Sequence, residues 1–118
     1  MATTTLARTL GLLTALVAAA QMQPKASEFM QAMHGSMERM DRQMATAPMN
    51  GNVDHDFAAM MIPHHQGAIN MAKAELIYGT DPVMRRLAQE ILVDQQSEID
   101  AMRLWLAKTT AGSTRKEK

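Results

Sequence analysis

Methionine recurs between residues 30 and 44 at intervals of 3, 4, 3 and 4, a spacing that constrains the fold of this chain more than any other feature. At about 100° per residue, these intervals place five side chains within an arc of roughly 80° on one helix. Almost no branched aliphatic residue accompanies them. This methionine stripe predicts either an adaptable core or a surface for soft metal ions, and the sequence leaves both open. Its members are Met30, Met33, Met37, Met40 and Met44.

Start and stop signals extend the helical pattern over most of the chain. We expect helices over residues 27–44, 54–78 and 83–108, with a turn-rich connection over residues 47–52. Ser27, Asp54 and Asp81 are the expected N-caps, and Pro63 should kink or split the second helix. Few aromatic residues and no strand pattern support an all-α fold, in which three long helices form an antiparallel bundle. A core of this size is often completed by dimerisation, so a homodimer is an open alternative.

The two ends of the chain have compositions that differ from the middle. Residues 1–20 combine Arg8, a short apolar run and three alanines at 18–20, which is typical of a secretory signal peptide. The alternative is a retained membrane anchor, although the run is shorter than the roughly 20 residues that a spanning helix needs. After cleavage near Ala20 we expect a mobile lead over residues 21–26, a helical domain over 27–108 and a disordered polar tail over 109–118. The mature chain would be periplasmic or secreted and would not insert in a membrane.

The composition excludes several kinds of site. Lys and Arg number 12 and Asp and Glu number 12, so the chain lacks the basic surplus that binding to nucleic acid requires. The absence of cysteine excludes disulfides, cysteine-based zinc sites and a thiol nucleophile. The chain nevertheless holds 13 methionines, and an exported protein without cysteine can offer soft ligands to a metal only through thioethers.

Two adjacent histidines in the second predicted helix each follow a methionine by one turn. Met60 precedes His64 and Met61 precedes His65, both at a separation of four residues, and Met71 lies two turns beyond His64. Imidazole together with thioether suits Cu(I) or Ag(I). Adjacent positions diverge by about 100°, so one ion takes both histidines only if the proline kink brings them together. The helix lacks His-Glu-x-x-His and paired Glu-x-x-His motifs, so neither a zinc protease nor a di-iron centre is expected.

Polar residues interrupt the apolar face of the third predicted helix. Gln95 and Glu98 project among apolar positions, and a buried carboxylate is costly unless it is paired. An imidazole from the second helix is the natural partner, because a carboxylate commonly orients a metal-bound histidine. A purely structural hydrogen bond would explain the same pattern, and both interpretations stay open. Met102 would add a thioether if it lies level with the histidines.

Two further histidines are secondary candidates. His34 lies at the edge of the methionine stripe, and we expect it to form a second, looser site with Met30, Met33, Met37 and Met40. His55 is flanked by Asp54 and Asp56 in the first turn of the second helix. Capping and compensation of the helix dipole explain that triplet, and a peripheral site for a harder ion such as Cu(II) is the alternative.

Residues 54–72 and 95–106 resemble the DUF305 family, which includes CopM-type copper-binding proteins of the bacterial periplasm. The shared pattern is Asp-x-x-Phe-x-x-x-Met-Ile-x-His-His-x-x-Ala-x-x-Met-Ala, followed by Gln-x-x-Glu-Ile-x-x-Met-x-x-Trp-Leu. The matching residues are Asp54, Phe57, Met61, Ile62, His64, His65, Ala68, Met71 and Ala72, then Gln95, Glu98, Ile99, Met102, Trp105 and Leu106. The resemblance implies a ferritin-like helical bundle, export, and binding of copper or silver through methionine and histidine.

These observations predict an exported copper-binding protein that is not an enzyme. It would bind Cu(I), with Cu(II) or Ag(I) as alternatives, and would sequester copper or exchange it with a copper-exporting or copper-accepting protein. One rival interpretation is an interaction module whose methionines grip a partner helix. The other is a copper-dependent redox enzyme, for which no acid–base or cofactor motif is present.

Overall fold

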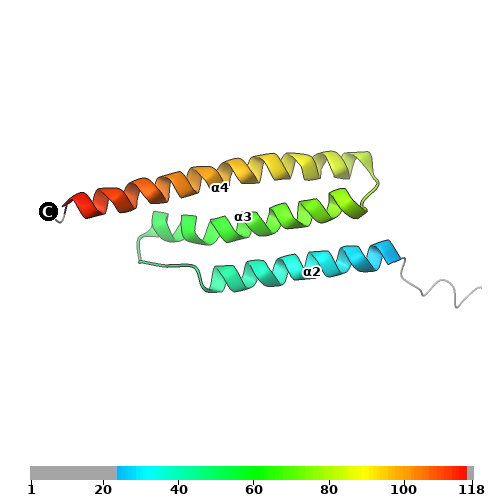
Figure 1. Cartoon of the computed structure of the whole chain (residues 1–118), viewed down its shortest axis with the longest axis horizontal. Helices are drawn as coiled ribbons and strands as arrows, with labels where there is room; N and C mark the ends of the chain where they lie inside the picture. The colour runs from blue at the N-terminus through cyan, green and yellow to red at the C-terminus, as the bar shows by residue number, and fades with distance from the viewer. Residues whose placement is uncertain (1–23, 117–118) are drawn as a thin grey trace, which may run out of the picture.

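The computed structural model describes residues 24–116, which form three helices joined by two short connections (Figure 1). α2 spans Pro24–Ala45, α3 spans Val53–Tyr78 and α4 spans Pro82–Lys116. Successive helices run antiparallel, and the described residues contain no strand. The predicted all-α fold with packed antiparallel helices is therefore confirmed. The predicted signal peptide at 1–20 lies outside the described residues. Within residues 24–116, none of the helices combines the length and hydropathy needed to span a membrane.

Short polar side chains set the starts of α3 and α4. Asn52 is the N-cap of α3, and its side chain accepts a hydrogen bond from the His55 N–H at 3.0 Å. The expectation that Asp54 caps this helix is wrong, because the helix starts at Val53 and Asp54 already lies in its first turn. Asp81 accepts hydrogen bonds from the N–H groups of the second and third residues after it, at 2.9 and 3.0 Å, and caps α4 as predicted.

The last carbonyls of α3 are satisfied by a side chain of α4. Arg85 donates to the Leu76 carbonyl at 2.6 Å and to the Gly79 carbonyl at 2.9 Å. A cation at the C-terminal end of a helix is also favoured by the helix dipole. Gly79 ends α3, as the sequence predicts, and its N–H donates to the Glu75 carbonyl at 2.8 Å. Arg85 therefore fixes the turn that makes α3 and α4 antiparallel.

Two helices are longer than predicted. α2 begins at Pro24 instead of after Ser27, because proline suits the first turn of a helix, where its missing N–H loses no hydrogen bond. The expected mobile lead is therefore wrong for residues 24–26. α4 continues to Lys116, so the expected disordered tail is wrong for residues 109–116. No proline follows to end α4, and the Thr109 hydroxyl donates to the Trp105 carbonyl at 3.1 Å, as helical threonines do.

Pro63 lies inside α3, and the helix continues through it. Of the two effects that the sequence predicts for Pro63, a kink or a split, the split does not occur. Proline cannot donate to the carbonyl four residues earlier, so one backbone hydrogen bond of α3 is missing at Ala59. The helix persists because α2 and α4 pack against it, and tertiary packing supplies most of the stability of a helix.

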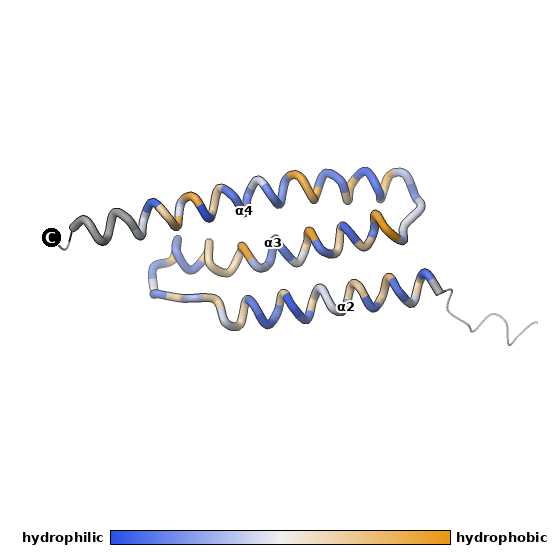
Figure 2. Tube along the Cα trace, viewed as in Figure 1, coloured by the Kyte–Doolittle hydropathy of each residue, from blue (hydrophilic) through white to orange (hydrophobic). Residues whose placement is uncertain are grey.

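α3 is the central helix of a flat layer. α2 and α4 each contact α3, and within residues 24–116 they do not contact one another (Figure 1). With Met60 set at 0°, the buried Gly67 and Ala74 project toward roughly 330°, and the buried Ala58 and Ile69 toward roughly 170°. The neighbours of α3 therefore lie on opposite sides of it. α3 carries hydrophobic positions along its length, whereas α2 is largely hydrophilic (Figure 2).

The core of this layer is small. Its buried apolar residues are mostly alanines, and Ile99 is the one large side chain among the described residues that is fully buried. Alanines let the helices approach closely but bury little apolar area each. The layer therefore has two well-packed seams and two broad faces that no other described element covers. The buried apolar residues are Ala58, Ala59, Ile69, Ala72, Ala74, Ala88 and Ile99.

The seam between α2 and α3 depends on a glycine. A Cβ at Gly67 would lie 2.6 Å from the Met40 sulfur and 2.9 Å from its Cβ and Cγ. We expect Gly67→Ala to lower the free energy of unfolding, because overpacking costs about 1–3 kcal/mol and the gain in helix propensity is only about 1 kcal/mol. Gly35→Ala in α2 is the matched control, since its Cβ meets nothing within 4 Å. Urea denaturation should show Gly35→Ala stabilised and Gly67→Ala destabilised; equal stabilisation of both would contradict this packing.

Candidate metal-binding site

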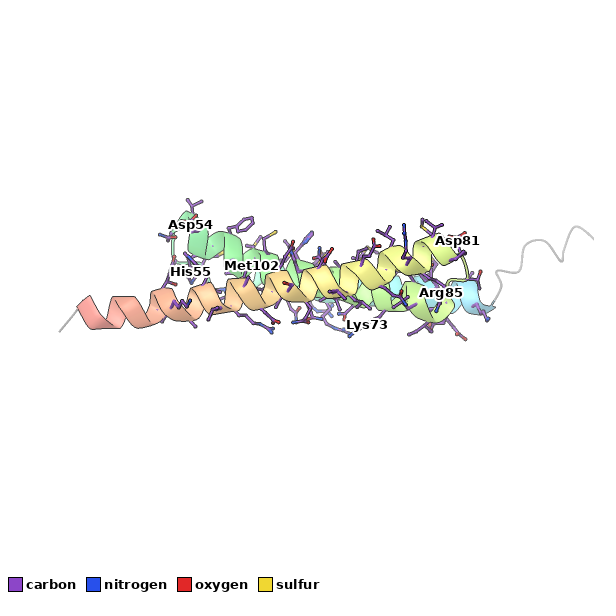
Figure 3. All side chains as sticks on the ribbon, turned by 90° about the horizontal axis from the view of Figure 1, so that it is seen from above. Asp54, His55, Lys73, Asp81, Arg85 and Met102 are labelled. Atoms are coloured by element: carbon purple, nitrogen blue, oxygen red, sulfur yellow. The ribbon has the colours of Figure 1, made fainter. Side chains whose placement is uncertain are left out.

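The predicted ligands gather on one broad face of the layer. By helix projection, this side presents methionines from α2, the exposed His64 from α3, and Glu98 with Met102 from α4. The opposite face is polar and presents exposed Arg39, Lys73 and Gln89. Figure 3 shows Met102 and Lys73 on opposite sides of the layer. We call the first side the methionine face, and it comprises Met30, Met33, Met37, Phe57, Met61, His64, Ala68, Met71, Met84, Leu87, Glu98, Met102 and Trp105.

Two hollows mark the methionine face. One, of about 300 Å³, lies over the C-terminal half of α3 and is lined by all three helices. Its lining includes Met33 of α2, Met71 of α3 and Leu87 of α4. The other, of about 330 Å³, lies toward the N-terminal end of α3 and is lined by Phe57 and Trp105, among others. The face is therefore apolar, grooved and exposed.

His65 and Glu98 form the polar contact between α3 and α4. The His65 Nε2 lies 2.6 Å from the Glu98 Oε2, and the His65 side chain is only 14% exposed. A carboxylate only accepts, so in the neutral ring Nε2 carries the hydrogen and Nδ1 presents a lone pair. That Nδ1 is buried without a hydrogen-bond partner, and so is the Oε1 of Gln95, one turn before Glu98. Buried acceptors are normally paired, so these two atoms suit a cation.

Methionines lie close to this contact. Met61 is one turn before His65, and Met102 is one turn after Glu98. Because His65 is level with Glu98 and the two helices run antiparallel (Figure 1), Met61 and Met102 lie level with each other, one turn away from the histidine. Met102 also lines the hollow at this end of the face. We name the set formed by Met61, His65, Gln95, Glu98 and Met102 the histidine cluster.

The methionine stripe is divided between the seam and the surface. Met33, Met40 and Met44 are half-buried along α3, whereas Met30 is 41% exposed and Met37 is 37% exposed. The stripe therefore serves partly as core and partly as surface. Its members Met30, Met33 and Met37, together with Met71 of α3, form the methionine cluster, of which Met33 and Met71 line the hollow of about 300 Å³. His34 is exposed beside Met30 and Met37, on the outer edge of α2.

The predicted ligands do not form one compact set. His64 is exposed on the methionine face, and its ring centroid lies 5.9 Å from that of His65, at an interplanar angle of 61°. Met60 projects toward α2 instead of toward the histidines. Met71 belongs to the methionine cluster, because two turns of helix separate it from His64. In residues 24–116, no three carboxylate or imidazole groups are close enough to hold a metal, so a site here needs thioether ligands.

His55 and Asp56 have a structural role at the start of α3. The Asp56 carboxylate accepts the N–H groups of Asn50 at 2.8 Å and of Gly51 at 3.0 Å, and it pairs with His55 Nδ1 at 3.0 Å. Gly51 has a φ of 87°, a conformation that glycine adopts without strain. The hydrogen bond from the Asn50 backbone N–H, followed by the one from the His55 side chain, lowers the pKa of Asp56 below its usual value. The capping interpretation therefore accounts for this triplet.

Acid should remove the contribution of Asp56 to stability. The pKa of Asp56 is lower in the folded chain than in the unfolded chain. The ionised carboxylate therefore stabilises the fold fully above the ordinary pKa of 3.8, and this stabilisation is lost as the pH falls through the pKa of the folded chain. We expect Asp56→Asn to lower the Tm at neutral pH and to converge with the native chain in acid. Asp54→Asn is the control and should change little. A deficit of Asp56→Asn that persists unchanged in acid, once the carboxylate of the folded native chain is protonated, would contradict this origin.

Two aromatic residues of the face were not predicted as part of the site. Phe57 is 62% exposed and Trp105 is 38% exposed, and both line the hollow that contains Met102. Their spacing in the sequence indicates that they share a helix face with the predicted ligands, because Phe57 precedes Met61 by four residues and Trp105 follows Met102 by three. They place an apolar wall beside the histidine cluster, which lowers the local polarity around any bound ion.

Comparison with known proteins places this sequence in a recognised family. The model of a family described as a domain of unknown function (DUF305) matches residues 3–106, a range that contains every member of both clusters. An uncharacterized protein of Acanthamoeba polyphaga mimivirus is 41% identical over 49 residues. That stretch is 42% of this chain and 32% of the relative, so the chain matches about a third of the length of the relative.

Proposed function

This chain belongs to the DUF305 family, and we propose that it is an exported protein that binds Cu(I) through histidine and methionine, with Ag(I) and Cu(II) as further ions. Its role is to sequester copper outside the cytoplasm or to deliver it to a copper-exporting or copper-accepting protein. The observation that carries the proposal is the buried His65 Nδ1, which has no hydrogen-bond partner while Nε2 is bonded to Glu98. The apolar run after Arg8 in residues 1–20 supports export.

The chemistry of the donor atoms favours a soft ion. Neutral imidazole and thioether bind Cu(I) and Ag(I) well. Zinc instead prefers thiolate, imidazole or carboxylate ligands, and harder ions prefer carboxylate. Glu98 accepts the His65 Nε2 hydrogen, which fixes the tautomer and raises the basicity of Nδ1. Met61 and Met102 supply thioethers one helical turn away. The histidine cluster therefore offers one nitrogen and two sulfurs without a direct carboxylate ligand.

The exposure of the second cluster supports delivery as well as storage. Met30 and Met37 are each more than one-third exposed, and His34 lies beside them. Thioethers on flexible side chains exchange soft ions readily, so an accessible methionine cluster can pass copper to or from another protein. We assign the tighter binding to the histidine cluster and the looser binding to the methionine cluster.

An anaerobic titration tests the proposal. Cu(I) is added to the chain in competition with a coloured Cu(I) chelator, and ¹³C-methyl NMR follows the methionines. We expect sub-micromolar binding and shifts of the methyl signals of Met61 and Met102, followed at higher loading by those of Met30 and Met37. Ag(I) should reproduce both steps because it is similarly soft. Failure of the chain to compete with the chelator, together with unchanged methyl signals, would refute copper binding.

The exposed apolar face also favours a second candidate function, an interaction module that grips a helix of another protein. Methionine-rich surfaces accept varied partners because the side chain is flexible and polarizable. This alternative needs no metal. A partner that binds equally well with and without Cu(I), to a chain that does not bind Cu(I), would support it over copper binding.

A further inference from the structure

The methionine face is too apolar and too large for the surface of an isolated small protein. Met84, Leu87, Phe57 and Met30 are each between 41% and 62% exposed on it. The layer beneath fully buries one large side chain, Ile99, among the described residues. Exposed apolar patches of this kind mark surfaces that another molecule covers. Covering this face would supply the core that the layer lacks.

The dimensions of the face suit a second copy of the chain. α3 has 26 residues, and at 1.5 Å per residue it is about 39 Å long. Three helices with axes 8–10 Å apart are about 25 Å wide, which gives a face of about 1,000 Å². A stable interface of standard size buries about 800 Å² on each partner. A second layer of the same shape covers this area completely, whereas a single helix covers only the groove.

The charges on this side permit self-association. Its described residues include no Lys or Arg. Among its carboxylates, Asp41 and Asp94 lie toward the rim, and Glu75 lines the hollow near the C-terminal end of α3. The strip along α3 is apolar around Ala68, and Glu98 is already paired with His65. Two copies therefore meet through an uncharged centre, and cations bound between them offset the acidic rims.

Symmetry brings particular residues together. A twofold axis that overlaps two such faces fully passes over the middle of α3, which lies between His65 and Gln66 in a helix that spans Val53–Tyr78. The exposed His64 then lies near the partner's His64, and Ala68 permits close approach of the two helices. We propose that this chain forms a symmetric dimer through the methionine face and that His64 of each copy completes the copper site of the other. The second part rests on the proposed copper binding.

The shared site explains why the two adjacent histidines point differently. His65 is turned toward Glu98 of its own chain, whereas His64 is exposed and binds across the interface. Each site then contains His65 with Met61 and Met102 from one copy and the partner's His64. This gives one copper for each chain at the interface, with four ligands of the soft type that Cu(I) accepts.

Two matched substitutions on α4 test the dimer in the full chain. Leu87→Glu places a charge in the groove of the methionine face, whereas Val93→Glu places the same charge on a 70% exposed position away from it. Sedimentation equilibrium should find a dimer for the native chain and for Val93→Glu, strengthened by Cu(I), and a monomer for Leu87→Glu. A native chain that is monomeric with and without Cu(I), or a Leu87→Glu variant that stays dimeric, would overturn the proposal.

Crosslinking locates the interface, because the chain has no cysteine of its own. With a short bismaleimide, Ala68→Cys should give covalent dimers and Lys73→Cys, on the polar face of the same helix, should not. Crosslinking through Lys73→Cys alone would overturn the proposal. A monomeric chain in which Ala68→Cys does not react with maleimide would also overturn the proposal, since another segment of the same chain would then cover the methionine face.

Copper affinity separates this proposal from the proposed function. Leu87→Glu keeps every ligand, so we expect its Cu(I) affinity to fall at least tenfold only because the partner's His64 is lost. A monomeric native chain that binds Cu(I) tightly would leave copper binding intact and refute the dimer. A dimer that does not bind Cu(I) would refute copper binding and the shared site. Native affinity in monomeric Leu87→Glu would refute the shared site alone.

Discussion

Replacing His65 with alanine should weaken Cu(I) binding by about 100-fold or more. Loss of an outer partner of a metal ligand alone costs about 10–100-fold, and this change removes the nitrogen ligand itself. His65 is the one histidine of the described chain whose ring has one nitrogen bonded to a carboxylate across a helix seam and the other buried without a partner. Competition with a Cu(I) chelator measures the change in affinity.

A histidine at the start of the same helix provides the control. His55 is also half-buried and also paired with a carboxylate, but it orders the Asn50–Asn52 connection and lies outside the histidine cluster. His55→Ala should keep the Cu(I) affinity within a fewfold of the native value. The Cu(I) affinity of Glu98→Gln should lie between those of His65→Ala and His55→Ala, because the substitution removes the charge that raises the basicity of His65. Equal affinities of the native chain and His65→Ala would move the tight site to the methionine cluster.

Replacing Ile99 with alanine should cost a large part of the stability of the whole chain. Truncation of a fully buried isoleucine typically costs about 2–5 kcal/mol, and small domains are stable by only about 5–15 kcal/mol. Ile99 has no exposed area, and the rest of the apolar core is mostly alanine. Urea denaturation at fixed protein concentration measures the difference.

An exposed β-branched residue of the same helix is the matched control. Val93 is 70% exposed, so Val93→Ala should change the free energy of unfolding by no more than about 0.5 kcal/mol. Ile99 follows Glu98 directly, so Ile99→Ala should also loosen the seam that holds His65. Loss of less than about 1 kcal/mol in Ile99→Ala would show that the seam between α3 and α4 is not the main source of stability.

The sequence predicts the helices well because their boundaries are coded locally. Asp81 before Pro82 marks the start of α4, and Gly79 marks the end of α3, as observed. The errors arise where two local signals compete. Asn52 and Asp54 can both cap a helix, and Asn52 does so by accepting the His55 N–H. The Asp56 carboxylate accepts the Asn50 N–H and so holds the turn before the helix in place.

The arrangement of the helices is less evident from the sequence. Periodicity shows that the methionine stripe shares one face of α2, but not that α3 buries one edge of it and leaves the other exposed. That division depends on the close packing of Met40 against Gly67, a contact between helices. The flat layer follows from small residues on opposite sides of α3, which a bundle prediction based on apolar stripes does not distinguish.

The residues of the candidate site were predicted from the sequence, but their arrangement in space was predicted only in part. The pairing of Glu98 with a histidine of α3 was an expectation from the cost of a buried carboxylate, and the structure shows it with His65. That Met71 shares a hollow with Met33 of α2 could not be foreseen, because it depends on how α2 is placed beside α3. The unpaired Nδ1 is likewise a property of three-dimensional packing and not of spacing.

X-ray absorption at the copper edge of the Cu(I)-loaded chain tests the central claim most directly. Binding at the histidine cluster predicts one coordination shell that contains both nitrogen and sulfur, at about 2.0 and 2.3 Å, the distances usual for imidazole and sulfur ligands of similar ions. His65→Ala at the same loading should contain less nitrogen in this shell and retain sulfur. A shell of nitrogen and oxygen without sulfur in the native chain would contradict the account, because it would place copper away from every methionine of the face.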